Sequence, residues 1–264
     1  MTARELHEYL RSNCPWVDPD HTVDTFKAGD PEAEVRGIAV SWMSRSATLR
    51  AAHAQGLNVF ITHEPTFWDH TERPVNGTEE DRCRKEAWLA ETGMVVIRCH
   101  DMLDQKPGFG IQDSWAAWLG LEGSPFEQMD AYRRIYAVEP RSLGAFAREI
   151  AAKLAPLGQH WVEYLGEAER VVKRVGIGTG AIVGGTEALV AYRDRGADAV
   201  LLTELTRWRE LSWAEDAGLS LLLIDHGVSE APSMRALARH LAKRYPSVPV
   251  RYIPAECPTL LAQP

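Results

Sequence analysis

Two stretches of the chain share one pattern: Gly56-Leu-Asn-Val-Phe-Ile-Thr-His-Glu64 and Gly196-Ala-Asp-Ala-Val-Leu-Leu-Thr-Glu204. In each stretch a glycine precedes a short apolar run, and a glutamate follows eight residues after the glycine. Short apolar runs that begin at a glycine are typical of buried β-strands that follow a turn. The two stretches therefore predict two buried strands that end in the same way.

A second pair of stretches repeats in the same order. Gly93-Met-Val-Val-Ile-Arg-Cys-His100 is followed by Asp104, and Gly218-Leu-Ser-Leu-Leu-Leu-Ile-Asp-His226 is followed by Glu230. A His-x-x-x-carboxylate sequence thus appears twice, each time directly after a predicted buried strand. Two matched blocks in one order indicate an internal repeat. We therefore predict two related lobes with pseudo-two-fold symmetry.

Predicted strands alternate with predicted helices along both halves of the chain. This alternation is typical of an α/β fold, with sheets covered by helices. We predict a first α/β lobe over residues 1–124, a connecting strand-helix-strand segment over 125–170 and a second α/β lobe over 171–264. The glycine-rich segment Gly176–Ala181 follows a predicted strand, and we interpret it as a plain turn. A dinucleotide site is disfavoured because Asp198 begins the next strand instead of ending it.

The composition excludes several classes of protein. The 264 residues carry a net charge of −8, and 45% of them are hydrophobic and 25% charged, which excludes a disordered chain or a coiled coil. No apolar run approaches the roughly 18 residues of a membrane span, and the charged N-terminus lacks a signal core. We therefore expect a cytoplasmic protein with no membrane partner. The acidic balance argues against a general nucleic-acid binder.

The ends of the predicted strands carry the chemistry. Ligands of open α/β sheets bind beyond the carboxyl ends of the strands. Seven side chains of metal-binding type fall at such ends: His63, Glu64, His100, Asp104, Glu204, His226 and Glu230. Imidazole and carboxylate together suit Zn, Mn, Fe or Mg. Two such ions about 3.5–4 Å apart would form a hydrolytic centre.

We assign metal binding to His63 and Glu64, which are adjacent, and to His226 and Glu230, which lie in a matching place. A histidine at the end of a strand is ordinarily a surface or hydrogen-bonding residue. The matched carboxylates in both halves reverse that expectation. These four residues are therefore predicted metal ligands.

Other polar residues near the strand ends have open roles. His100 either binds a metal ion or orients Asp104 from behind, and we favour the second role. Glu204 is a ligand, a general base or a helix N-cap, and the spacing does not separate these roles. Asp69 and His70 are interpreted as solvated loop residues, with entry into the site as the alternative.

Several motifs in one order identify a resemblance. They are Gly29-Asp-Pro31, Phe60-Ile-Thr-His-Glu-Pro-Thr-Phe67, His100-Asp-Met-Leu-Asp104, Pro107-Gly-Phe-Gly-Ile-Gln-Asp113, Leu119-Gly-Leu121, Leu202-Thr-Glu204 and Asp225-His-Gly-Val-Ser-Glu230. Together they resemble the Nif-three-like dinuclear metal-centre family, whose members are often labelled GTP cyclohydrolase I type 2 homologues. The resemblance spans roughly residues 1–255.

The resemblance implies a two-lobed α/β fold, a toroidal homo-hexamer and a site for two divalent metal ions between the lobes. Carried over to this chain, the implied metal ligands are His63, Glu64, Asp104, His226 and Glu230. The chain departs from the family at Glu64, where the family has a second histidine. It also departs at His100-Asp-Met-Leu-Asp104, where the family has His-Thr-Asn-Leu-Asp, and after Glu204, where the family has a nearby histidine.

Two functions follow from these residues. The first is a metal-dependent hydrolase of nucleotides or other small phosphorylated substrates, with Glu204 and His100 as predicted catalytic residues and Glu64 as an alternative base. The second is a non-catalytic metal-binding protein that serves as a regulatory or scaffold ring. The substrate and the native metal are not specified by the sequence.

Overall fold

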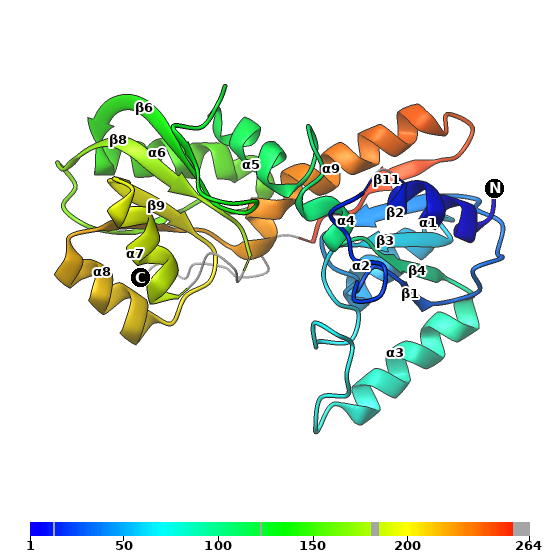
Figure 1. Ribbon diagram of the computed structural model, residues 1–264. Helices are drawn as coiled ribbons and strands as arrows, with labels where there is room; N and C mark the ends of the chain where they lie inside the picture. The colour runs from blue at the N-terminus through cyan, green and yellow to red at the C-terminus, as the bar shows by residue number, and fades with distance from the viewer. Residues whose placement is uncertain (13, 122, 181–184, 256–264) are drawn as a thin grey trace. The chain divides into compact units, whose positions relative to one another are not determined.

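The computed structural model describes residues 1–12, 14–121, 123–180 and 185–255 (Figure 1). Its helices are α1 (Ala3–Arg11), α2 (Ser46–His53), α3 (Glu79–Thr92), α4 (Asp101–Asp104), α5 (Ile111–Leu119), α6 (Leu143–Leu154), α7 (Thr186–Asp194), α8 (Ser212–Ala217) and α9 (His226–Arg244), with short helical turns at Ala155–Leu157 and Arg207–Leu211. Its strands are β1 (Phe26–Ala28), β2 (Ile38–Ser41), β3 (Val59–Thr62), β4 (Val95–Arg98), β5 (Glu127–Gln128), β6 (Arg134–Ser142), β7 (Glu163–Leu165), β8 (Val171–Ile177), β9 (Ala199–Leu202), β10 (Ser220–Leu223) and β11 (Val250–Tyr252).

The described chain forms two compact units. Unit 1 comprises residues 1–110 and 233–255, and unit 2 comprises residues 111–232. These boundaries differ from the expected ones at 124 and 170. The segment expected to connect two lobes instead supplies β5, β6, α6 and β7 to unit 2, because β6 pairs with β8 and β7 pairs with β10. The last strand, β11, was expected in the second lobe but pairs with β2 of unit 1.

The sheet of unit 1 has the strand order β1-β4-β3-β2-β11. Strands β2, β3, β4 and β11 are parallel, and the edge strand β1 is antiparallel to β4. In the register of the central strands Thr62 lies beside Arg98. The residues that follow these two strands, His63 and Cys99, therefore leave the sheet at the same carboxyl edge.

Both faces of this sheet are buried. On one face, α2 and α3 contribute Leu49 and Leu89 to a cluster with Phe60 and Val96 of the central strands. Side chains alternate across a strand, so the neighbouring residues face the other side. Ile61 and the other residues of that face are also fully buried. Burial on both faces explains why these strands read as continuous apolar runs in the sequence.

The sheet of unit 2 has the strand order β5-β6-β8-β9-β10-β7. Strands β8, β9 and β10 are parallel, and β6 and β7 flank them in the antiparallel direction. Leu202 lies beside Leu223 in the register of β9 and β10. Helices α5 and α6 and the first turns of α9 cover one face, and α7 and α8 cover the other.

The two units repeat one strand arrangement, which confirms the predicted two-lobed α/β class. In each unit three consecutive parallel strands are followed in the sheet by an antiparallel edge strand, β1 in unit 1 and β7 in unit 2. The glycines that begin the repeated stretches are also equivalent. Gly56, Gly93, Gly196 and Gly218 all have positive φ, from 63° to 81°, a backbone conformation that glycine adopts without steric cost. The units differ at the other side, where β11 is parallel to β2 and β6 is antiparallel to β8.

None of the helices in the described part of the chain combines the length and apolar character that crossing a membrane requires. The thiols of Cys14, Cys83 and Cys99 are free, and Cys257 lies outside the described residues.

Candidate metal centre

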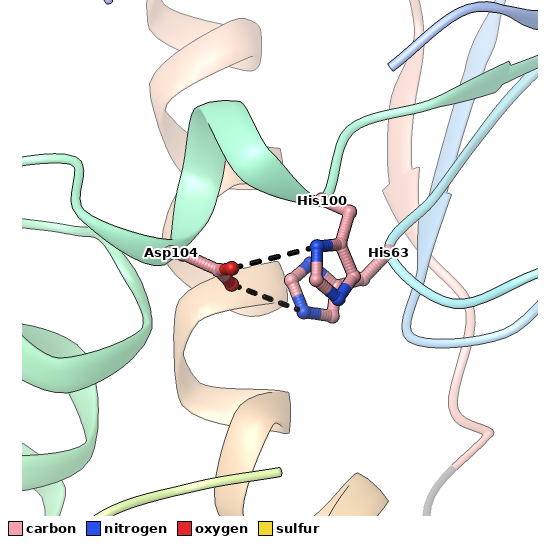
Figure 2. Close-up of side chains that lie close together, drawn as sticks. All are labelled: His63, His100 and Asp104. Carbon is pink, nitrogen blue, oxygen red and sulfur yellow. Dashed lines mark ion pairs between the residues drawn. The ribbon is translucent and has the colours of Figure 1, made fainter. Parts of the chain in front are cut away.

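The carboxyl edge of unit 1 brings His63, His100 and Asp104 together (Figure 2). His63 Nε2 lies 3.6 Å from Asp104 Oδ1, and His100 Nδ1 lies 3.4 Å from Asp104 Oδ2. One potential ligand atom from each residue falls within 4.8 Å of the other two. The cause is local: β3 and β4 end side by side, and α4 returns the Asp104 carboxylate toward both rings.

The hydrogen bond of His63 determines which ring nitrogen faces the carboxylate. Its Nδ1 lies 3.1 Å from the carbonyl oxygen of Cys99, and the side chain is fully buried. A carbonyl oxygen only accepts hydrogen bonds, so Nδ1 is the donor. In the neutral ring Nε2 then holds the lone pair, and this nitrogen faces Asp104. Metal-binding histidines are oriented in the same way, with the second nitrogen donating to an oxygen.

His100 is surrounded by carboxylates. Its Nδ1 lies 2.9 Å from Asp101 Oδ1. Burial lowers the pKa of His100, but the hydrogen bond to Asp101 and the charges of Asp104 and Glu64 outweigh burial and raise this pKa to about 9. Burial acts to raise the pKa of Asp101, yet hydrogen bonds from His100 and Thr22 bring it below its ordinary value. In the metal-free protein His100 is therefore an imidazolium paired with a carboxylate.

Asp24 anchors the start of α4, and the sequence patterns missed it. Its fully buried carboxylate accepts hydrogen bonds from the backbone N–H groups of His100 and Met102. Burial raises the pKa of Asp24 to about 6, against the lowering effect of these two bonds. Asp24 lies in a loop 76 residues before His100, so no local spacing connects the two.

Glu64 faces a buried cation. Arg98 is fully buried, and its Nη2 lies 3.7 Å from Glu64 Oε2. Arg98 also donates to the carbonyl oxygen of His63 at 3.0 Å and to that of His70. An arginine inside a buried strand requires hydrogen-bond acceptors. The position of Arg98 in an apolar run is therefore a sequence signal that could have identified it as a residue of this cluster.

His70 is exposed, as expected for a loop residue, yet it approaches the cluster. Its ring meets that of His100 edge to face, with centroids 5.0 Å apart. Potential ligand atoms of Glu64, His70 and His100 lie within 4.8 Å of one another. Asp69 instead accepts hydrogen bonds from Thr71 and Arg73 within its own loop.

Unit 2 places Glu204 and Glu230 on the two nitrogens of His226. Nδ1 of His226 lies 2.7 Å from Glu204 Oε1, and Nε2 lies 3.0 Å from Glu230 Oε1. The hydrogen bond with His226 lowers the pKa of Glu204, against the effect of burial. In the neutral ring, donation by Nδ1 to Glu204 leaves Nε2, which lies beside Glu230, as the nitrogen able to bind a metal ion. The arrangement matches that of His63 in unit 1, with the Glu204 carboxylate in place of a backbone carbonyl.

The glycine-rich turn of unit 2 allows the backbone to approach this histidine. Gly180 has φ +68°, and a Cβ atom there would lie 3.4 Å from His226 Nε2 and 3.6 Å from Glu230 Oε1. Thr203 Oγ1 donates to the Gly180 carbonyl oxygen at 3.0 Å. At Gly176 a Cβ would lie 2.6 Å from the Tyr192 ring. Close packing thus accounts for Gly176, and the positive φ accounts for Gly180. Ala181 lies outside the described residues.

Each predicted site residue belongs to one of two sets. The unit 1 set contains His63, Glu64, His100 and Asp104, and the unit 2 set contains Glu204, His226 and Glu230. Both sets offer imidazole nitrogen beside carboxylate oxygen, which fits divalent ions such as Zn, Mn or Fe. The orientation of His63 and His226, with Nδ1 bonded to an oxygen and Nε2 facing a carboxylate, supports this fit.

Known proteins resemble the chain over nearly its whole length. A curated relative from Chlamydia pneumoniae, named GTP cyclohydrolase 1 type 2 homolog, is 25% identical over 234 residues, covering 86% of this chain and 87% of the relative. The solved structure of a Bacillus cereus protein related to NIF3 has a TM-score of 0.79 at 13% identity, covering 99% of both chains. Protein ybgI, whose function is given as unknown, has a TM-score of 0.78 at 22% identity, covering 97% of this chain and 100% of its own.

The match to a family is more direct than these pairwise similarities. The sequence model of Duf34/NIF3 (NGG1p interacting factor 3) matches residues 1–258. The structural neighbours have the same two-lobed fold, and the motif-based resemblance is confirmed. The chain therefore belongs to the Duf34/NIF3 family.

Proposed function

We propose that this protein binds divalent metal ions through both sets of side chains and hydrolyses a nucleotide or another small phosphorylated substrate. The observation that carries the proposal is the shared orientation of His63 and His226. In each ring Nδ1 contacts an oxygen acceptor and Nε2 faces a carboxylate. The name of the curated relatives, GTP cyclohydrolase 1 type 2 homolog, supports a hydrolytic reaction.

In this proposal some residues of the two sets bind metal ions and others position those ligands. His63 and Asp104 would hold an ion in unit 1, and His226 and Glu230 would hold an ion in unit 2. Glu204 orients His226 through the bond to Nδ1, which makes it a positioning residue in this proposal.

His100 and Glu64 complete the unit 1 set. His100 contacts Asp104 and stacks on His63, so it limits the movement of two ligands. Glu64 remains a predicted ligand or base, with Arg98 beside its carboxylate. A bound divalent ion supplies Lewis-acid polarisation of a phosphoryl or carbonyl oxygen and a water of lowered pKa.

The test is the metal content of the purified full-length protein, measured by elemental analysis after dialysis against Mn²⁺ or Zn²⁺. We expect about two ions per chain, with about one lost in His63→Ala and about one lost in His226→Ala. His160→Ala is the matched control, because His160 is exposed and belongs to neither set. Equal metal content in all four proteins would contradict the assignment of these ligands.

Hydrolysis is tested separately on the metal-loaded protein. We expect turnover of at least one member of a panel of nucleotides and phosphodiesters, and we expect His226→Ala to abolish it. Metal binding without turnover of any substrate on the panel would contradict the proposed hydrolase activity and support metal binding alone.

One observation favours a non-catalytic metal-binding protein as the second candidate. The guanidinium of Arg98 lies against Glu64, where the family has a second histidine. A fixed positive charge at this carboxylate opposes a divalent cation on the same oxygen. A single ion per chain, unchanged in Glu64→Gln, would support this alternative. The homo-hexamer and the cytoplasmic location stay predictions.

A further inference from the structure

Unit 2 contains a cavity of about 480 Å³ beside the Glu204–His226 pair. It opens at the carboxyl ends of β9 and β10, where Leu202 and Leu223 lie side by side in the register. Glu163, at the start of the antiparallel strand β7, pairs with Leu223 and reaches the same edge. Cavities of about 300–1,000 Å³ beyond the carboxyl ends of parallel strands are ordinary places for small-molecule binding.

The cavity has an apolar base and an aromatic wall. Leu202 and Ile224 are nearly fully buried and line it, together with the partly buried Leu223. Trp161 adds an indole ring to the lining. These surfaces suit a flat apolar body such as an aromatic ring.

A buried glutamine fixes the wall in place. Gln159 is 3% exposed. Its Oε1 accepts from the backbone N–H of Asp225 at 3.0 Å, and its Nε2 donates to the carbonyl oxygen of Trp161 at 2.9 Å. One side chain therefore ties the aromatic wall to the segment that carries Asp225. A wall held in this way loses little conformational entropy when a ligand binds.

The charges of the lining are predominantly negative. Three carboxylates, those of Glu163, Glu204 and Asp225, line the cavity with one guanidinium, that of Arg207. Arg207 is paired with Glu163 through two contacts of 3.0 and 2.8 Å. The Arg207–Glu163 pair cancels, and Glu204 also contacts His226 at 2.7 Å, so the lining still carries more carboxylates than cations. A phosphate group is repelled by this surface, whereas a cation with several N–H donors is attracted.

We propose that this cavity binds a planar organic cation, an amidinium or guanidinium group joined to a flat apolar body. The N–H groups bond to Glu204 and Asp225, and the apolar body lies against Trp161 and Leu223. Glu204 then connects the bound group to His226. That this group belongs to the substrate rests on the proposed function, whereas the binding itself does not.

The test uses benzamidine as the probe and isothermal titration calorimetry on the full-length protein, with and without prior chelation of metals. We expect benzamidine to bind in both preparations. Benzoate has the same shape and the opposite charge, and we expect it to bind at least tenfold more weakly. Benzoate that binds as tightly as benzamidine would overturn the proposal.

Variants locate the binding site. We expect Asp225→Asn and Glu204→Gln each to weaken benzamidine about tenfold or more, since each removes a charged hydrogen-bond acceptor. Glu187→Gln is the matched control, because it removes the same charge from an exposed position outside the lining. Circular dichroism checks that each variant is folded. If one of the two cavity variants does not fold, the other still tests the proposal. Equal affinity in the wild type and both cavity variants would overturn the proposal.

The outcomes also separate this proposal from the proposed function. Loss of benzamidine binding in folded Asp225→Asn, with metal content normal, supports the cavity alone, whereas Glu204→Gln also alters the partner of His226. If the protein holds two ions and hydrolyses a substrate but does not bind benzamidine, the proposed cation binding in the cavity is refuted. The proposed metal centre is then unaffected.

Discussion

The imidazole of His63 lies face to face with that of His100, with ring centroids 4.4 Å apart and ring planes inclined by 13°. The two residues follow adjacent parallel strands, so the stack joins the ends of β3 and β4. It restricts the ring of His63, which the hydrogen bond to Cys99 already orients. A ring held by two contacts requires less ordering on metal binding, the role proposed for His63.

The stack predicts how substitutions of His100 rank. His100→Phe keeps a flat ring against His63 but loses the contact with Asp104, whereas His100→Ala loses both. We expect metal affinity to fall in the order wild type, His100→Phe, His100→Ala, with a loss of about 10-fold to 100-fold for alanine. Competition with a fluorescent chelator measures the affinities. Equal affinity for phenylalanine and alanine would show that stacking has no effect.

Glu204 predicts a different ranking in unit 2. Its carboxylate accepts the hydrogen bond from Nδ1 of His226. The amide oxygen of Glu204→Gln can still accept this bond, whereas Glu204→Ala removes the acceptor. We expect alanine to lower metal affinity by about 10-fold to 100-fold and glutamine to lower it less. If both variants lose the ion completely, Glu204 is itself a ligand.

The position of Gly180 beside His226 predicts that a substitution there lowers metal affinity, and Gly185 provides a control variant. Gly180→Ala places a methyl group 3.4 Å from His226 Nε2, at a backbone φ of +68°. Gly185→Ala introduces similar backbone strain at φ +93°, with open space around the new Cβ. We expect both variants to lose about 1 kcal/mol of stability, and only Gly180→Ala to lose metal affinity. Urea denaturation and metal titration measure the two effects, and equal metal affinity of both variants would contradict the role of Gly180.

Lys85 predicts a pH dependence of stability. Its ammonium group is buried, donates to the carbonyl oxygen of Thr66 at 2.6 Å, and has a pKa lowered by burial to about 8. From about pH 8 to the unfolded value of 10.5 the unfolded chain binds the proton more tightly than the folded protein. Stability therefore rises with pH across this interval.

The comparison with Lys85→Met isolates this contribution. The unfolding free energy of the wild type, relative to that of the variant, should increase between pH 8 and pH 10 by on the order of 1–3 kcal/mol. Thermal or urea denaturation at several pH values measures the difference. A constant difference between the two proteins across this interval would show that the pKa of Lys85 is not lowered.

The repeated stretches made the centre of each unit predictable. A glycine, a buried apolar run and a polar residue at the strand end are all local features. Each can be recognised from a short stretch of consecutive residues. The buried strands expected after Gly56 and Gly218 are present as β3 and β10. The pairing of His226 with Glu230 also follows from local spacing, because residues four apart share a helix face.

Features that depend on distant parts of the chain were not predictable. The contact of Asp24 with the backbone of His100 has no sequence periodicity behind it. The edge strands β1 and β7 have three residues each and are only partly buried or exposed, so they carry no clear alternation. The pairing of β11 with β2 joins residues more than 200 positions apart, and only the folded structure records it.

The interrupted path of unit 1 along the chain has a consequence for biosynthesis. Every strand of unit 2 ends by Leu223, whereas the sheet of unit 1 needs β11, which ends at Tyr252. Until that segment leaves the ribosome, the apolar strand β2 is an open edge able to pair with other chains. The part of the protein that is translated first is thus the part that completes its sheet last, and nascent chains stalled before Val250 are the form most exposed to aggregation.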